Sequence, residues 1–160
     1  MNIRRATIHD LDLVTEIEAA CFLPAEAAPR KSFEARLQIF PDYFWILEEE
    51  GNARGFINGP VINQNIIDDE MYAEANCHRQ DGEWQTVFGI NTLPEYRKQG
   101  LGKVMIEAVI ECARREGRKG CVLTCKDYLL PFYESMGFRS MGISASTHGG
   151  ASWNDMILEF

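Results

Sequence analysis

Hydrophobic and polar residues follow two different periods along this chain, and the period switches several times between its two ends. Between residues 11 and 21, apolar side chains recur every three or four positions, which is the spacing of one helix face. Between residues 153 and 160 they alternate with their neighbours, which is the spacing of a half-buried strand. The pattern therefore predicts a chain that mixes helices with strands.

Breaks made by proline and glycine divide the pattern into elements. The predicted elements, in chain order, are strand 2–6, helix 11–21, helix 32–39, strands 43–49 and 54–62, strand 84–93, helix 100–116, strand 121–125, a short helix from 131, and strands 138–146 and 153–160. Residues 63–81 are polar and acidic, and predict a long loop or a partly helical insertion. The strand–helix–strand unit from 84 to 125 requires a crossover, so its strands should be parallel neighbours. The expected fold class is therefore α/β, with a mixed sheet and helices packed on it.

The composition indicates one domain. The chain has 160 residues, 46% of them hydrophobic, which is enough for a single core over residues 1–160. Its formal net charge is -8, and an acidic chain is a poor nucleic-acid binder because phosphate neutralisation supplies most of that affinity. An acidic surface suits a small cationic substrate, although it also serves solubility alone. We therefore expect no nucleic acid among its partners.

Cysteine usage and apolar runs indicate a soluble, cytoplasmic protein. The five cysteines form no Cys-x-x-Cys pair and their number is odd, so neither a disulfide framework nor a zinc site is implied. No apolar run reaches membrane-spanning length, and no apolar signal core follows the N-terminal residues. We expect no membrane partner and no bound metal.

A basic, glycine-containing turn stands between the predicted strand 84–93 and the most apolar helix. It has the form Arg-x-x-Gly-x-Gly, at Arg97, Gly100 and Gly102. Such a turn aims backbone amides and the positive end of a helix dipole at one anion, and its glycines let a phosphate approach closely. The Gly-x-x-x-x-Gly-Lys-Ser/Thr of a P-loop and the third glycine of a dinucleotide fingerprint are both absent. The turn predicts a phosphate or pyrophosphate cradle; the alternative is an ordinary turn that opens a surface helix.

This turn, placed after a strand and Leu93-Pro94, resembles the acetyl-CoA-binding motif of the GNAT superfamily of N-acetyltransferases. The order of elements over nearly the whole chain is also similar to that superfamily. The resemblance implies a central mixed, mostly antiparallel sheet with a splayed parallel pair, flanked by helices. It implies acetyl-CoA as co-substrate. The residues that the resemblance assigns to it are Arg97, Lys98, Gln99, Gly100, Leu101, Gly102 and Lys103, together with the main chain of Ile90, Asn91 and Thr92 in the splayed strand.

A second match covers residues 123–138, which read Cys-x-Asp-x-Leu-x-Pro-Phe-Tyr-x-x-x-Gly-Phe from Cys125. This pattern is similar to the serotonin (arylalkylamine) N-acetyltransferase branch. The resemblance implies that Tyr133 lies beside the CoA sulfur and protonates the departing thiolate, and that Phe22 lies near the acceptor. That branch carries two histidines in the central strand, where this chain has Thr86 and Phe88. Phe88 is therefore expected to form an apolar wall for the substrate with Phe22.

The base that removes the amine proton is left open by the sequence. An alkylamine with a pKa of roughly 10.4 is neutral only about once per few thousand molecules at pH 7. Candidate direct or water-linked acceptors are Glu18, Glu26 and Glu83, with His78 as the histidine nearest the central strand. Each has an alternative as an ordinary surface or loop residue.

These observations together predict an enzyme that moves an acetyl group from acetyl-CoA to a primary amine, a small arylalkyl- or alkylamine, by direct transfer in a ternary complex. One alternative is acetylation of an N-terminal or lysine amine on a peptide or protein, which needs a groove left open by residues 63–81. Another is an acetyl-CoA-binding module without turnover. The sequence identifies neither the amine nor whether the chain is a monomer or a homodimer.

Overall fold

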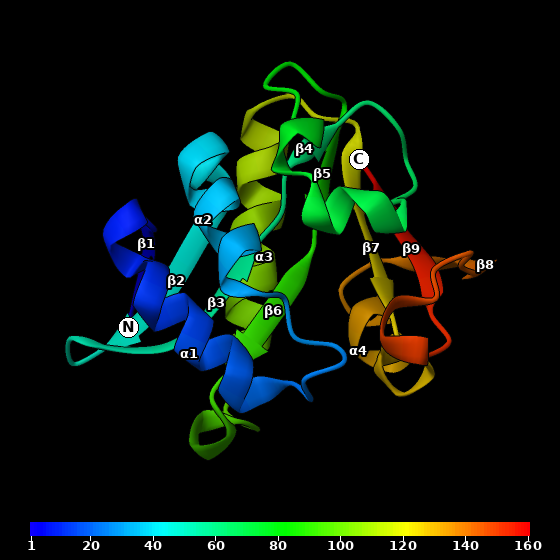
Figure 1. Ribbon diagram of the computed structural model, residues 1–160. Coiled ribbons are helices and arrows are strands. Elements are labelled where there is room, and N and C mark those ends of the chain that lie inside the picture. Colours follow the sequence, from blue (N-terminus) through cyan, green and yellow to red (C-terminus); the bar gives the residue numbers. More distant parts are fainter.

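The computed structural model describes residues 1–160, and its strands form two sheets that meet at Phe88 (Figure 1). One sheet has the strand order β1-β2-β3-β6 and the other has the order β4-β5-β7-β9-β8. The strands are β1 (Asn2–Arg5), β2 (Phe44–Glu49), β3 (Asn52–Asn58), β4 (Val61–Ile62), β5 (Trp84–Val87), β6 (Gly89–Thr92), β7 (Gly120–Cys125), β8 (Arg139–Ile143) and β9 (Asn154–Glu159).

The predicted strand 84–93 is divided, and this division creates the splay. β5 runs parallel to β7, with Val87 opposite Leu123, whereas β6 pairs antiparallel with β3 in the other sheet. All other strand pairs are antiparallel. The expectation of a mixed sheet with a splayed parallel pair is thus confirmed. The prediction of one unbroken strand over 84–93 was wrong. Phe88 does not pair with β7, and its backbone N–H donates a hydrogen bond to the Asn58 carbonyl (2.8 Å).

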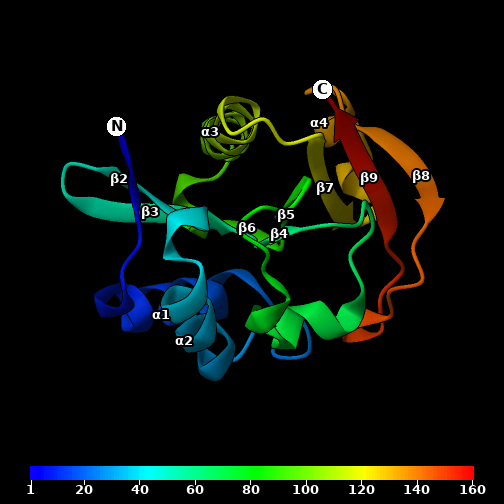
Figure 2. The same cartoon turned by 90° about the horizontal axis from the view of Figure 1, so that it is seen from above.

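Helices cover both faces of this arrangement. They are α1 (Leu11–Cys21), α2 (Arg30–Ile39), α3 (Leu101–Arg115) and α4 (Leu130–Glu134). Figure 2 shows α1 and α2 on one side of the sheets and α3 on the other. Val14 of α1 and Phe33 of α2 pack against Phe44 and Phe56 of the sheet and form a hydrophobic core with them. The helical period places these two side chains on the side of each helix that faces the sheet. None of the helices has both the length and the apolar character to cross a membrane.

Local chemistry explains where most elements begin and end. The Thr7 hydroxyl accepts from the His9 amide and the Asp10 carboxylate from the Thr7 amide, a capping box that opens a 3-10 turn leading into α1. Gly100, at φ +80°, precedes α3. The second strand of the predicted hairpin is interrupted at Gly59 and Pro60, and residues 63–81 contain two short 3-10 helices, as a partly helical insertion requires.

Candidate active site

A cavity of about 970 Å³ opens where β6 and β7 diverge. The loop after α1, helix α2 and the 63–81 segment border it on one side of the sheets, and the start of α3 and helix α4 border it on the other. The cavity therefore passes through the gap between the two sheets. A donor molecule and an acceptor molecule can meet in it from opposite sides.

The turn before α3 presents an array of free backbone amides. None of the backbone N–H groups from Lys98 to Lys103 donates a hydrogen bond within the chain. The first helical hydrogen bond runs from the Val104 N–H to the Gly100 carbonyl (3.2 Å). Lys98 (φ +64°) and Gly100 (φ +80°) adopt left-handed backbone conformations, an alternation typical of anion-binding nests. This geometry has the donors that a pyrophosphate requires.

The predicted cofactor residues occupy different places around this turn. Arg97, Lys98 and Gly102 line the cavity, together with Ile90, Asn91 and Thr92 of β6. Gln99, Gly100 and Lys103 are exposed on the turn. Leu101 is buried in the core, so its amide alone is available to a ligand. Their role in binding acetyl-CoA stays a prediction.

Tyr133 lies on α4 and borders the cavity next to Phe132, whose ring is 5.0 Å away in an edge-on arrangement. The residue is 4% exposed, and its hydroxyl makes no hydrogen bond within the chain. Burial, and to a smaller degree the nearby Cys125 thiol, raises the pKa of the Tyr133 hydroxyl well above its usual value. The side chain is therefore a protonated phenol whose donor is free for a ligand.

Aromatic rings line the part of the cavity beside Phe88. Phe88 lies 4.6 Å from Tyr72, and Tyr72 in turn stacks on His148 at 5.6 Å. Phe22 and Trp153 also border this part and are half-buried. The structure thus brings the two predicted substrate residues, Phe22 and Phe88, into one cavity.

Four segments that are distant in sequence are joined by polar contacts beside these rings. The Lys126 Nζ meets Glu26 Oε1 at 2.5 Å, and the Glu26 carbonyl bonds His148 Nε2 at 2.9 Å. Asp69, in the 63–81 segment, accepts from the Thr147 amide at 3.0 Å and bonds the Ser146 hydroxyl. We call these contacts of Glu26 and Asp69 the clasp. The clasp ties the loop after α1 and the 63–81 segment to the β8–β9 loop.

The sequence profile of the Acetyltransferase (GNAT) family matches residues 11–138. The chain belongs to the GNAT acetyltransferase family. It is 27% identical over 157 residues to serotonin N-acetyltransferase of Mesocricetus auratus, covering 96% of this chain and 74% of that one. With the serotonin N-acetyltransferase of Macaca mulatta it shares 28% over 109 residues, 68% of this chain and 52% of that enzyme.

Solved structures agree on the fold. The GphF GNAT-like decarboxylase in complex with isobutyryl-CoA superimposes with a TM-score of 0.86, at 22% identity, over 99% of both chains. Membership of the family makes the protein an acyl-CoA-dependent N-acetyltransferase.

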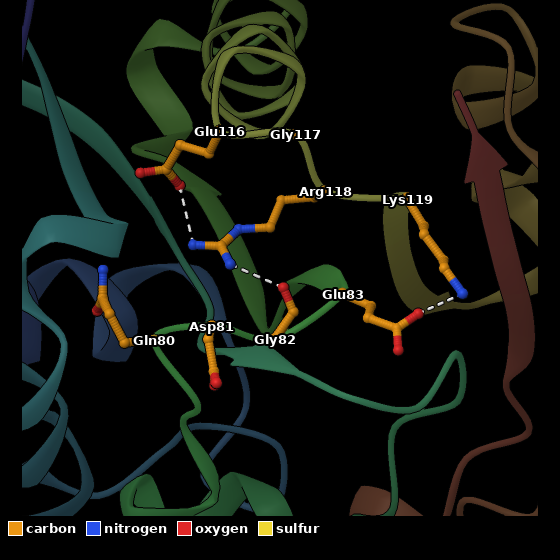
Figure 3. A pocket seen from close by; sticks show the side chains of 8 residues that line it. All are labelled: Gln80, Asp81, Gly82, Glu83, Glu116, Gly117, Arg118 and Lys119. Carbon is orange, nitrogen blue, oxygen red and sulfur yellow. Dashed lines mark hydrogen bonds and ion pairs between the residues drawn. The ribbon is translucent and has the colours of Figure 1, made fainter.

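The geometry of this GNAT acetyltransferase separates the candidate bases. Glu18 and Glu26 border the cavity, whereas Glu83 pairs with Lys119 in a different pocket that no hydrophobic residue lines (Figure 3). His78 is also outside the cavity, and its Nδ1 accepts from the Val61 amide at 3.0 Å. Burial lowers the pKa of His78, which fits a neutral structural imidazole.

Arg118 and Glu116 of the Figure 3 pocket are also paired locally. Arg118 donates to the Gly82 carbonyl (2.7 Å) and to Glu116 (3.2 Å), which joins the α3–β7 turn to the segment before β5. This pocket is a structural junction of the GNAT fold. It lies apart from Tyr133 and the amide turn, none of whose residues line it.

Thr86 stands at one of the two positions where the serotonin N-acetyltransferase branch carries a histidine, but unlike Phe88 it does not border the cavity. Thr86 is fully buried, and its hydroxyl donates to the Pro60 carbonyl at 2.6 Å. The residues that border the cavity and that sequence reasoning missed include Tyr72, His148 and Arg36. Tyr72 and His148 lie in short 3-10 helices, which are too short to show a period, and only the tyrosine's size in an otherwise polar stretch hinted at burial.

Proposed function

We propose that this protein transfers the acetyl group of acetyl-CoA to a small primary amine that carries an aryl or alkyl group, by direct transfer in a ternary complex. One observation carries the proposal. A single cavity joins the free amides of the 98–103 turn and the Tyr133 hydroxyl to an acceptor end lined by aromatic rings and closed by the clasp. The names of the two mammalian relatives support the same class of acceptor.

Acetyl-CoA fits the donor side of the cavity by its chemistry. The amides from Lys98 to Lys103 supply donors for the pyrophosphate, and Arg97 and Lys98 supply positive charge. The main chain of β6 leaves β7 at Val87 and offers polar groups to the pantetheine arm. A path from the turn to Tyr133 passes Gly102, whose missing side chain leaves space beside Phe132.

In the proposed reaction the neutral amine attacks the thioester carbon, and the carbon–sulfur bond breaks. The departing thiolate takes the proton of the Tyr133 hydroxyl, and Tyr133 regains a proton that the new amide nitrogen loses through solvent in the cavity. The net reaction converts the amine and acetyl-CoA into the N-acetyl amide and free CoA, with no change in total charge. A phenol can donate to a thiolate whose conjugate acid lies roughly near pKa 8.5 only uphill, so positioning beside the sulfur carries much of its effect.

The enclosed acceptor end favours a small amine over a peptide. A peptide acceptor needs a groove open at both ends, and here the clasp connects the walls through Glu26 and Asp69. The ring walls of Phe22, Phe88 and Trp153 suit an aryl or alkyl group. The exposed carboxylates of Asp68 and Glu70, on either side of Asp69, attract the ammonium form by steering.

The test is a comparison of kcat/KM across acceptors, followed by release of the CoA thiol. We expect 2-phenylethylamine and tryptamine to exceed spermidine and a short peptide by at least tenfold. If spermidine or the peptide is preferred by tenfold or more, the arylalkylamine proposal is wrong while the acetyltransferase activity stands. If no amine releases thiol from acetyl-CoA, the proposed reaction itself is refuted.

A further inference from the structure

Two side-chain amides beside Gly89 carry polar atoms that the chain leaves unpaired. Asn58 on β3 and Asn91 on β6 are each 1% exposed and border the cavity. Asn58 Nδ2 and Asn91 Oδ1 are buried and have no hydrogen-bond partner. Because an unpaired buried polar atom is costly, a free donor and a free acceptor that face one point indicate a missing ligand group. We call Asn58 and Asn91 the amide fork.

Two buried charges fix which way each amide faces. Arg36 Nη1 donates to Asn58 Oδ1 (3.1 Å), and a guanidinium only donates, so Asn58 must turn its Nδ2 away from Arg36. Glu18 Oε1 accepts from Asn91 Nδ2 (2.7 Å), and a carboxylate only accepts, so Asn91 must turn its Oδ1 away from Glu18. Burial lowers the pKa of Arg36 to about 10, which still leaves the guanidinium charged near neutral pH. The fork is therefore one fixed donor and one fixed acceptor.

Gly89 lies beside both free atoms. A Cβ at Gly89 would lie 3.7 Å from Asn91 Oδ1 and 3.8 Å from Asn58 Nδ2, in ordinary contact, and its φ is not in the left-handed region. At the strand glycines Gly55 and Gly120, by contrast, a Cβ would meet a neighbouring carbonyl oxygen at 2.1 Å and 1.9 Å. Neither backbone approach nor φ requires glycine at position 89. A ligand group at the place where a side chain of residue 89 would stand would contact both free atoms.

We propose that the amide fork binds a hydroxyl group of the acceptor amine, which accepts from Asn58 Nδ2 and donates to Asn91 Oδ1. The inference rests on the proposed function, since it names a subclass of the same acceptor. A carboxylate would face the Asn91 oxygen with no proton between them, and an ammonium would face the Asn58 donor with no lone pair; a hydroxyl satisfies both atoms. An amide of CoA has the same two capacities, but the fork is hydrogen-bonded to Glu18 of α1 and Arg36 of α2, two helices that lie on the side of the sheets opposite to α3 (Figure 2).

The experiment compares three amines that differ in one hydroxyl. For the wild type, we expect tyramine or 2-amino-1-phenylethanol to exceed 2-phenylethylamine by at least about tenfold in kcat/KM, because the unhydroxylated amine leaves two buried polar atoms unpaired. The position of the preferred hydroxyl, on the ring or on the chain, then locates the fork relative to the reacting nitrogen.

Two variants test the fork itself. Asn58→Asp keeps an oxygen for Arg36 and replaces the free donor with an acceptor, so the preference for the hydroxylated amine should disappear. Gly89→Ala fills the gap without a clash, so it should lower the hydroxylated amine to the rate of 2-phenylethylamine. Asn63→Asp makes the same charge change at an exposed position and should leave the preference intact.

Three results overturn the proposal: equal kcat/KM for all three amines in the wild type, a preference that survives in both variants, or a rise in KM for acetyl-CoA that is the same with every acceptor. The last result would assign the fork to CoA. Calorimetric binding of the same amines to the CoA-loaded protein repeats the comparison without turnover. An enzyme that acetylates none of them therefore refutes the proposed function, while binding still decides the fork.

Discussion

At the scale of single residues, the placement of Tyr133 decides which chemical form of the side chain is present. The phenol is buried against Phe132 and Phe138 and has no hydrogen-bond partner in the chain. Burial disfavours the phenolate and raises the pKa, so the hydroxyl stays protonated through the neutral and mildly alkaline range. A group held in this form can give a proton but cannot act as the base that takes one from an ammonium.

We therefore expect Tyr133→Phe to lower kcat by on the order of 10²–10⁴-fold, since it removes the proton donor and keeps the ring. Affinity for acetyl-CoA, measured by calorimetry, should change little. Tyr96→Phe is the control, because Tyr96 does not border the cavity and its ring packs against Arg54 instead. An unchanged kcat in Tyr133→Phe with a good substrate would remove this residue from the mechanism.

At the scale of elements, the start of α3 is organised around what it leaves free. The amides before and within the first turn have no acceptor in the chain, and Gly102 adds space toward Phe132 and Ile90, which lie 3.5 Å and 3.8 Å from where its Cβ would be. The helix remains anchored because Leu101 and Met105 are buried beneath it. The start of α3 is thus fixed to the core by Leu101 and Met105, while its backbone amides stay free for a ligand.

Gly102→Val should place a branched side chain in that open space and weaken acetyl-CoA binding at least about tenfold, or about 1.4 kcal/mol. Glu111→Val is the control, since it also introduces valine into α3 but at an exposed position away from the turn. Calorimetric titration with acetyl-CoA measures both. Equal affinity of Gly102→Val and the wild type would show that the pyrophosphate binds elsewhere.

The clasp gives a second prediction at this scale. Lys126→Met removes the ion pair to Glu26 but keeps an apolar stem against Trp153, over whose ring Lys126 Nζ lies at 5.6 Å. Because such a partly exposed pair contributes up to about 1 kcal/mol, KM for a small amine should rise by up to about fivefold. Lys119→Met, which removes an exposed ion pair with Glu83 outside the cavity, should leave the amine KM unchanged. A rise of the same size in both variants would mean that overall charge, not the clasp, sets KM.

These elements also show where sequence reasoning succeeds. The helices and strands were predictable because each carries its own period and its own breaks, as in the capping box at Thr7 and the glycine before α3. The division at Phe88 was not predictable. The residues before Phe88 pair with β7 and the residues after it pair with β3, although they form one continuous strand-like pattern in the sequence. The alternation along the strand is the same for both partners.

The candidate site was predictable only in its local parts. The amide turn and the Tyr133 segment are continuous in sequence, so their patterns could be read directly. The amide fork and the clasp depend on contacts between distant residues, such as Asn91 with Glu18, 73 positions apart, and His148 with Glu26, 122 positions apart. Only the fold brings these side chains together, and no period or spacing signals them.

At the scale of the whole molecule, the arrangement supplies a proton donor for the thiolate but engages the nearby carboxylates in other contacts. Glu18 accepts from Asn91 and from the Ala28 amide, and Glu26 is paired with Lys126. His148 bonds the Glu26 carbonyl through Nε2. The amine is therefore expected to react as the small neutral fraction already present in solution.

This reasoning predicts the pH profile. With an amine pKa of roughly 10.4, kcat/KM should rise about tenfold per pH unit from about pH 7 to 9, as the neutral fraction does. Tyr133 does not counteract the rise, because its raised pKa keeps the hydroxyl protonated over that range. His148→Gln, which retains a donor for the Glu26 carbonyl, should show the same slope. If the wild type instead reaches a plateau below pH 9 and His148→Gln loses that plateau, His148 is the base and the free-amine mechanism is wrong.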